Sequence, residues 1–328
     1  MQSTYHTAVR EVYKRAAEAP AKNLCCVPQA PQYLPGLKIP GIMHEMNYGC
    51  GATVDPKDMT RNQSVVYVGV GGGLELLQLA YFTRRSGGVI GVDPVGEMRD
   101  VCRKNLEEAA KVNDWFDPDF IDLRDGDALA LPLDDASVTF AAQNCLFNIF
   151  TTGGDLEKAL SEVHRVLKSG GRLAMSDPVS PYPLPEGVKN DAVLRAECIG
   201  GCLPFDEYVR HVTDAGFGAA EIRSRRPYRH LDVATYGHLG LERDTMLETI
   251  EITAFRTPMP GDGPCVFTGR TATYIGGDEE FDDGKGHLLP RNLPQPVCDK
   301  TAGALERLGR SDLVITGSTF HYGGGGCC

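Results

Sequence analysis

The sequence predicts an α/β fold in which a mostly parallel sheet carries helices on both faces. Strand-like and helix-like segments alternate between residues 64 and 176, which is the main observation behind this prediction. A glycine run, Gly69-Val-Gly-Gly-Gly73, stands where the first strand turns into a helix, and Asp93 ends the second strand. Such a turn and such a carboxylate are typical of sheets that bind a nucleotide-like ligand.

The expected elements follow from hydrophobic periodicity and from proline and glycine stops. Apolar positions recur at helical spacing over residues 4–19 and predict a helix that Pro20 ends. Residues 20–62 hold six prolines and are predicted to be mostly loop, with one helical turn around Ile42 to Met46. The next expected elements are strand 64–68, helix 74–82, strand 88–93, helix 95–112, strand 120–124, strand 137–143, helix 156–167 and strand 172–176.

Three parts of the chain are expected. Helix 205–215 and strands 220–228 and 249–256 complete a core with a seven-stranded sheet over residues 62–257. Residues 1–61 form an N-terminal segment that carries cysteines. Residues 258–328 are rich in glycine and proline, and we expect a small C-terminal α+β module there.

Length and composition exclude several classes of protein. Of the 328 residues, 42% are hydrophobic and 23% are charged, as in an ordinary soluble globular protein. The formal net charge of -11 repels polyanions and anionic membrane surfaces, so neither nucleic acid nor a membrane is an expected partner. The apolar run 65–82 is interrupted by glycines, Glu75 and Gln78, and the first twenty residues contain no apolar leader. We therefore expect a cytoplasmic protein.

Eleven cysteines are the most unusual feature of the composition. An odd number in a reducing compartment argues against a disulfide framework and favours thiol chemistry or metal binding. Zinc is the main alternative ligand, but zinc sites favour C-x-x-C spacing, and the nearest case is Cys198 with Cys202. The chain ends in the pair Cys327-Cys328 after four glycines, which we interpret as a flexible dithiol rather than a prenylation signal.

Acidic residues after the strands indicate an S-adenosyl ligand. Asp93 follows Gly73 by 20 residues, where a carboxylate can accept both ribose hydroxyls of a dinucleotide or of an S-adenosyl ligand alike. Asp127 and Ala128 follow the third strand, at the position where methyltransferases hold the adenine amino group. No basic clamp for a pyrophosphate stands near the glycine run. The alternative interpretation is that Asp93 and Asp127 only cap helices.

Four short segments, taken in order, resemble the arsenite S-adenosylmethionine methyltransferases. They are Asn47-Tyr-Gly-Cys-Gly51, Gln143-Asn-Cys145, Glu197-Cys-Ile-Gly-Gly201 and Gly263-Pro-Cys-Val-Phe-Thr-Gly269. The likeness covers about residues 20–275 and is greatest to the arsenosugar-biosynthesis type, whose segments match at Leu24–Cys26, Tyr67–Gly73 and Gly324–Cys328. The resemblance implies a Rossmann-like class I methyltransferase fold and an enzyme of arsenic detoxification that gives mono- and dimethylated arsenicals.

The resemblance also implies which residues form the site. Cys198 and Cys265 would be the principal ligands of As(III), with Cys50 as the third ligand or an exchange thiol, and Cys25 or Cys26 would exchange with Cys50. The terminal dithiol would capture arsenite or its products. The residues expected to contact S-adenosylmethionine are Tyr67, Gly69, Gly71, Gly73, Asp93, Asp127, Ala128 and Asn144.

The expected chemistry needs soft ligands and no catalytic base. Trivalent arsenic, from arsenite or an organoarsenical, prefers thiolates, and its lone pair would attack the sulfonium methyl group. Such a displacement depends on positioning, which agrees with the absence of a persuasive catalytic dyad or triad in the sequence. Methylation formally oxidises arsenic, so electrons must come from these thiols or from an external reductant, thioredoxin or glutathione.

Several points stay open at this stage. Tyr67 stands two positions before the first glycine, where class I methyltransferases usually have an acid, so the group that holds the methionine amino group is unassigned. Cys145 is expected near the cofactor and Cys102 in the packing of a helix, whereas Cys202 and Cys298 fit no motif. The alternatives to arsenite methylation are a quinone-type C-methyltransferase with dispensable cysteines and a non-catalytic thiol protein that binds a metal or metalloid.

Overall fold

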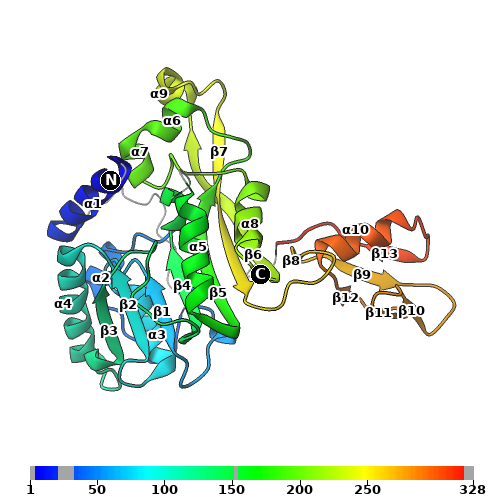
Figure 1. Cartoon of the computed structure of the whole chain (residues 1–328), viewed down its shortest axis with the longest axis horizontal. Coiled ribbons are helices and arrows are strands. Elements are labelled where there is room, and N and C mark those ends of the chain that lie inside the picture. The colour runs from blue at the N-terminus through cyan, green and yellow to red at the C-terminus, as the bar shows by residue number, and fades with distance from the viewer. Residues whose placement is uncertain (1–3, 21–32, 151–153, 321–328) are drawn as a thin grey trace.

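The computed structural model describes residues 4–20, 33–150 and 154–320 of the chain. An eight-stranded sheet with the order β3-β2-β1-β4-β5-β7-β6-β8 forms its centre (Figure 1). Strands β1 to β5 run parallel, and β7 is antiparallel to both β5 and β6. The strands are β1 (Val65–Val68), β2 (Val89–Asp93), β3 (Ile121–Asp125), β4 (Val138–Asn144), β5 (Leu167–Val179), β6 (Ala219–Leu231), β7 (Thr245–Phe255) and β8 (Cys265–Phe267). The predicted mostly parallel α/β sheet is confirmed.

Helices cover both faces of the sheet, which explains the unbroken apolar run of β1. Val66 and Val68 belong to a core that includes α5 and α8, while Val65 and Tyr67 belong to a second core that includes α3 and α4. Successive side chains of a strand point to opposite faces, so all four residues are buried. The sequence predicts these four helices with nearly the same ends. They are α3 (Leu74–Thr83), α4 (Gly96–Val112), α5 (Asp155–Val166) and α8 (Phe205–Asp214).

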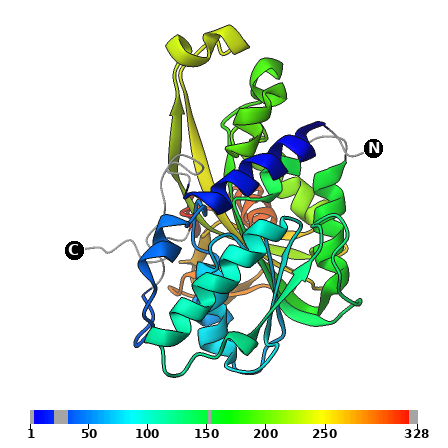
Figure 2. The same ribbon diagram turned by 90° about the vertical axis from the view of Figure 1, so that its left-hand side faces the viewer.

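The N-terminal segment begins with α1 (Thr4–Glu18), which lies between α4 and α7 (Ala192–Ala196) (Figure 2). A long connection leads through α2 (Gly41–Glu45) and the 3-10 helix η1 (Pro56–Asp58) to β1. The predicted first helix and the predicted turn near Met46 are therefore confirmed. The remaining short helices are η2 (Pro118–Phe120), η3 (Phe147–Phe150), α6 (Glu186–Asn190), α9 (Val233–Tyr236) and η4 (Gly237–Leu239).

The chain after β7 forms a small module that stands off one end of the sheet (Figure 1). It has a hydrophobic cluster of its own, which includes Tyr274, Leu289 and Leu305. Strand β8 pairs with β6 and so extends the main sheet by one strand beyond the seven that the sequence predicts. The other elements of the module are β9 (Thr271–Tyr274), β10 (Glu280–Asp282), β11 (Leu288–Pro290), β12 (Gln295–Pro296), α10 (Asp299–Arg307) and β13 (Leu313–Ile315).

The division of the chain at residues 61 and 257 stays a prediction. Among the described residues, no helix combines the length and the apolar character that a bilayer crossing requires.

Candidate active site

A cavity of about 950 Å³, partly open to solvent, lies beside the glycine run. Side chains of α1, including Arg10 and Tyr13, form one wall. Seven of the eight predicted cofactor contacts line the cavity, namely Tyr67, Gly69, Gly71, Asp93, Asp127, Ala128 and Asn144. Gly73 is not among the lining residues. It precedes α3 with a φ of 88°, and an added Cβ would lie 3.0 Å from the Cys102 sulfur, so this glycine serves the turn and the packing.

Asp93 closes the glycine run from the end of β2. Its Oδ2 accepts a hydrogen bond from the Val70 N–H at 3.0 Å, and its Oδ1 accepts one from the Val95 N–H at 2.9 Å. Burial raises the pKa of Asp93 to about 6, although these N–H groups and Arg99 oppose the shift. Val95 is the N-cap residue of α4, which has no side-chain cap hydrogen bond, so Asp93 links the end of β2 to the start of α4 without capping the helix. Each carboxylate oxygen keeps a second lone pair, so the same residue can also accept ligand hydroxyls.

Asp127 connects the cavity to α1. Its Oδ2 accepts a hydrogen bond from Arg10 Nη2 at 3.1 Å, and its Oδ1 accepts one from the Leu129 N–H at 3.0 Å. The Arg10 and Asp127 side chains are 37% and 31% exposed, so solvent screens this ion pair and its contribution to stability is small. A ligand amino group can therefore compete with Arg10 for the carboxylate.

Glu75 supplies the acid that the sequence lacks at position 67. The Tyr67 hydroxyl lies close to the Glu75 carboxylate, whose Oε1 accepts a hydrogen bond from Asn144 Nδ2 at 2.9 Å. Burial raises the pKa of Glu75, and burial together with the Glu75 charge raises the pKa of Tyr67. Glu75 lines the cavity, where a carboxylate suits an ammonium group. It escaped prediction because it lies within α3, after the glycine run rather than before it.

Asn144 fastens the loop that carries Cys50. Its Oδ1 accepts a hydrogen bond from the Cys50 N–H at 2.9 Å, and its Nδ2 donates to the Gly51 carbonyl at 2.8 Å. A Cβ on Gly49 would lie 2.3 Å from Asn144 Nδ2, and a Cβ on Gly51 would lie 2.2 Å from Ser176 Oγ. The Gly-Cys-Gly sequence is thus required by the close approach of the loop to the sheet. It leaves the Cys50 thiol buried, 3.5 Å from Ser176 Oγ.

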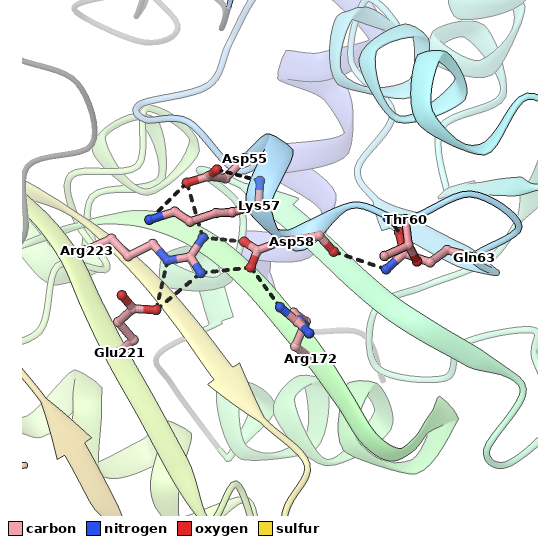
Figure 3. Close-up of polar contacts among 8 residues, drawn as sticks. All are labelled: Asp55, Lys57, Asp58, Thr60, Gln63, Arg172, Glu221 and Arg223. Atoms are coloured by element: carbon pink, nitrogen blue, oxygen red, sulfur yellow. Dashed lines mark hydrogen bonds and ion pairs between the residues drawn. The ribbon is translucent and has the colours of Figure 1, made fainter.

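A buried ion network holds the other end of this loop against the sheet (Figure 3). Asp58 of η1 is 2% exposed, and its Oδ1 accepts hydrogen bonds from Arg172 of β5 and Arg223 of β6, each at 2.9 Å. Burial alone would raise the pKa of Asp58, but the hydrogen bonds and charges of Arg223 and Arg172 outweigh it and lower the pKa. Asp58 is therefore a charged anchor, and residues 50–58 are held at both ends.

Cys145 and Cys198 lie next to each other in strained backbone conformations. Their φ angles are 58° and 59°, in the left-handed region that residues other than glycine seldom adopt and that often marks functional sites. The Cys198 thiol donates to the Cys145 carbonyl at 3.1 Å, and the Cys202 thiol donates to the Cys198 carbonyl at 3.3 Å. The Cys145 N–H donates to the Ser176 carbonyl at 2.7 Å, so Cys50 and Cys145 both contact Ser176.

Asp177 is a buried acid beside this cysteine cluster that was not predicted. Its carboxylate accepts hydrogen bonds from the Tyr208 hydroxyl at 2.7 Å, from the Asn148 N–H at 3.3 Å and from the Gln143 amide. Burial raises its pKa to about 7, although these donors oppose the shift. Asn148 in turn donates to the Cys198 carbonyl at 2.6 Å, so Asp177 helps to position Cys198.

The structure does not bring Cys265 to the other two predicted arsenic ligands. Cys265 pairs with Ala219, which is level with Arg172 on β5, whereas Cys50 lies beside Ser176, four residues further along β5. This separation is about 13 Å along the strand, and β8 lies three strands, or about 14 Å, from β5. In the described ranges, no three or more His, Cys, Asp or Glu side chains are grouped so that they could hold a metal ion. The predicted exchange thiols lie outside the described residues: Cys25, Cys26, Cys327 and Cys328.

The strand order, the glycine run and the cavity define the fold of the class I S-adenosylmethionine-dependent methyltransferases. A family model described as a methyltransferase domain matches residues 66–175. This stretch runs from β1 into β5 and contains the glycine run, Asp93 and Asp127. The predicted fold class is confirmed, and the match agrees with the predicted class of enzyme.

Several proteins similar to this chain are arsenite methyltransferases. The one from Halobacterium salinarum is 30% identical over 54% of this chain and 43% of its own length, and the human one is 29% identical over 52% and 44%. The chain therefore spans less than half the length of these two relatives. The arsenite methyltransferase of Aquipseudomonas alcaligenes is 29% identical over 77% of this chain and 72% of its own length.

A solved structure supports the fold. It is an arsenic(III) S-adenosylmethionine methyltransferase from Chlamydomonas reinhardtii, with a TM-score of 0.59 and 23% identity over 89% of this chain and 99% of that chain.

Proposed function

We propose that this protein is an arsenite methyltransferase, which transfers a methyl group from S-adenosylmethionine to As(III), and that the thiols of Cys50, Cys145 and Cys198 move together around arsenic when it binds, since the described residues form no three-ligand group without it. The observation that carries the proposal is the chain of contacts that joins these cysteines beside a cavity that Cys145 itself lines. The Cys50 thiol contacts Ser176 Oγ, the Cys145 N–H donates to the Ser176 carbonyl, and the Cys198 thiol donates to the Cys145 carbonyl. The similarity to arsenite methyltransferases supports the choice of substrate.

The residues of the cavity suit S-adenosylmethionine. Asp93 has lone pairs for the two ribose hydroxyls, Asp127 can accept the adenine amino group, and Glu75 can accept the methionine ammonium group. When bound, S-adenosylmethionine supplies a methyl group on a positively charged sulfur. Glu75 also argues against the alternative of a non-catalytic thiol protein. That alternative depends on Tyr67 standing where an acid is usual, and Glu75 provides a carboxylate in the same cavity.

The thiols supply soft ligands and hold the nucleophile. Three thiolates bind As(III) and leave its lone pair available for attack. Arsenic replaces the hydrogen bond that the Cys198 thiol makes to the Cys145 carbonyl. The resemblance implies Cys265 as an arsenic ligand, and we propose Cys145 in this role instead. Cys265 lies level with Arg172 of β5, not with Ser176.

Each methyl transfer changes the oxidation state of arsenic. The lone pair of As(III) accepts the methyl group as a cation, so the arsenic becomes formally As(V). A pair of thiols then gives two electrons to the arsenic and forms a disulfide, which returns the arsenic to As(III). Cys50 with Cys25 or Cys26 supplies this pair, thioredoxin or glutathione reduces it again, and Cys327-Cys328 captures arsenite or product. This cycle gives monomethylated and then dimethylated arsenicals in the cytoplasm, for detoxification or for arsenosugar assembly.

The test is methylation of arsenite by the purified protein with S-adenosylmethionine and glutathione or thioredoxin, with arsenic species separated by liquid chromatography. We expect Cys50→Ser, Cys145→Ser and Cys198→Ser each to lower the rate roughly a hundredfold, because a misplaced reactant loses about this much. Calorimetry should show unchanged S-adenosylmethionine binding in the Cys198→Ser protein. The control is Cys102→Ala, since Cys102 is buried in the core against α3. Wild-type rates in the three serine variants would refute the proposed ligand set.

A further inference from the structure

Cys198 occupies a backbone position at which glycine is the usual residue. It follows the C-terminal end of α7, and its φ of 59° lies in the left-handed region. The Ile199 N–H donates to the Leu194 carbonyl at 2.8 Å, and the Cys198 N–H donates to the Arg195 carbonyl at 3.1 Å. These two hydrogen bonds form the pattern that ends a helix with a left-handed residue. Glycine adopts this conformation more easily than cysteine, so further contacts are needed to hold the turn.

Two buried donors bind the carbonyl oxygen of Cys198. Asn148 Nδ2 donates to it at 2.6 Å, and the Cys202 thiol donates to it at 3.3 Å. Because the Cys198 N–H is bonded as well, the peptide groups on both sides of this residue are held. Rotation of the Cys198 backbone would break at least one of these bonds. The direction of the side chain is therefore fixed, and its thiol keeps its contact with the Cys145 carbonyl at 3.1 Å.

The main chain of Asn148 is itself held against the sheet. Its N–H donates to the Asp177 carboxylate at 3.3 Å, which also accepts a hydrogen bond from the Tyr208 hydroxyl at 2.7 Å. Gly201 allows the segment that carries Cys202 to approach, because a Cβ at Gly201 would lie 1.6 Å from the Asn148 carbonyl oxygen. The contacts thus form a continuous chain from α8 through β5 and η3 to the Cys198 carbonyl.

We infer that Cys202 is a positioning residue for Cys198, which acts together with Asn148 through the Cys198 carbonyl and does not itself bind arsenic. A thiol has one proton, and Cys202 gives it to this carbonyl. If the Cys202 sulfur bound arsenic as a thiolate, the turn would lose this donor. The inference rests on the proposed function for the reaction that Cys198 serves, whereas the positioning itself does not require arsenic.

Three substitutions at Cys202 separate the effect of the donor from the effect of volume. Cys202→Ser keeps a proton donor, Cys202→Ala is close to serine in size but has no donor, and Cys202→Val fills the space of the thiol without a donor. We expect kcat for arsenite methylation to fall roughly tenfold in the alanine and valine variants, because Cys198 is misplaced, and to stay within about twofold in the serine variant. The KM for S-adenosylmethionine should not change, since Cys202 does not line the cavity.

The matched control is Cys102→Ala, which makes the same change at a buried cysteine of the other core cluster and should keep the wild-type kcat. Calorimetry with S-adenosylmethionine verifies that each variant is folded. Equal losses in Cys202→Ser and Cys202→Ala would overturn the inference, because a ligand or a packing role would then explain them. Wild-type kcat in either variant without a donor, or an equal loss in Cys102→Ala, would overturn it as well.

A crosslink tests the same geometry without methylation. Dibromobimane joins two neighbouring thiols, and it can enter through the cavity that Cys145 lines. Peptide mapping by mass spectrometry then measures how fast the bridge between Cys145 and Cys198 forms. We expect formation to be roughly fivefold slower in Cys202→Ala and Cys202→Val than in the wild-type, Cys202→Ser and Cys102→Ala proteins.

The crosslink also separates this inference from the proposed function. An absent bridge in the wild-type protein, or equal rates in all five proteins, would overturn the positioning role. A wild-type protein that forms the bridge, with variants that follow the expected order, but that fails to methylate arsenite would refute the proposed function and leave the role of Cys202 standing.

Discussion

Replacement of Asp58 by asparagine tests whether the ion network holds the Cys50 loop to the sheet. Asp58→Asn keeps the size of the side chain but leaves Arg223, which is 11% exposed, without its main counter-charge. Removal of one partner from a buried pair costs about 3–5 kcal/mol, and the 32% exposure of Arg172 together with the retained amide oxygen reduces this to about 2–3 kcal/mol. At an unfolding entropy of about 2 cal/mol/K per residue, the expected fall in Tm is about 3–4 °C.

The matched control is Asp55→Asn. Asp55 lies 3.6 Å from Arg223 but is 31% exposed, so the loss should stay near 0.5 kcal/mol, or about 1 °C. The assays are thermal unfolding by circular dichroism and the rate at which iodoacetamide alkylates Cys50 in the native protein. We expect faster alkylation of Cys50 in Asp58→Asn only. Equal Tm values for the two variants would show that the network does not stabilise the fold as argued.

Three other predictions concern the site. Gly51→Ala places a methyl group 2.2 Å from Ser176 Oγ and so displaces the loop that carries Cys50. We expect the rate of arsenite methylation to fall roughly tenfold or more, while the S-adenosylmethionine affinity measured by calorimetry stays unchanged. Full activity of this variant would contradict the prediction. Asp93→Asn removes charge-assisted hydrogen bonds worth about 1.5–3 kcal/mol, so the Kd for S-adenosylmethionine should rise about 10- to 100-fold, and an unchanged Kd would exclude Asp93 as a cofactor ligand. The pKa of Asp177 is raised from 3.8 to about 7 in the folded protein. Above about pH 4 the unfolded chain therefore releases a proton that the folded protein keeps. This carboxyl accordingly lowers the free energy of unfolding by up to about 1.4 kcal/mol for each pH unit between about pH 4 and pH 7. Urea unfolding between pH 5 and 7 should therefore show a weaker loss of stability with rising pH in Asp177→Asn, and parallel curves for both proteins would refute this.

Local patterns were sufficient for the strands and helices of the core. Strand β1 is buried on both faces, so its sequence is an unbroken apolar run that predicts a strand. The glycine run follows β1 directly and Asp93 ends β2, so both could be placed from neighbouring residues in the sequence. The sequence predicts an α+β module after residue 257 but does not locate helix α10, because this helix is short and lies among glycines and prolines, where periodicity is hard to detect.

The arrangement of the cysteines could not be obtained in the same way. Cys145 and Cys198 are 53 residues apart and meet only because α7 returns to the end of β4. Cys265 lies in a strand, but its sequence does not reveal that β8 runs parallel to β6 with Cys265 at the end away from Ser176. Likewise, Glu75 provides the carboxylate that is absent at Tyr67. It does so from the helix after the glycine run, and the spacing between the strands does not predict this contact.

The positions of the seven described cysteines have a practical consequence for labelling studies. Five are buried, and only Cys265 and Cys298 are partly accessible. Reaction of the native protein with a colorimetric thiol reagent should accordingly be at least biphasic, with an early phase from the C-terminal module and a late phase limited by local opening near β4 and β5. A single averaged thiol count, or a single ratio of arsenic to protein, would therefore combine accessible cysteines of the C-terminal module with buried cysteines of the core.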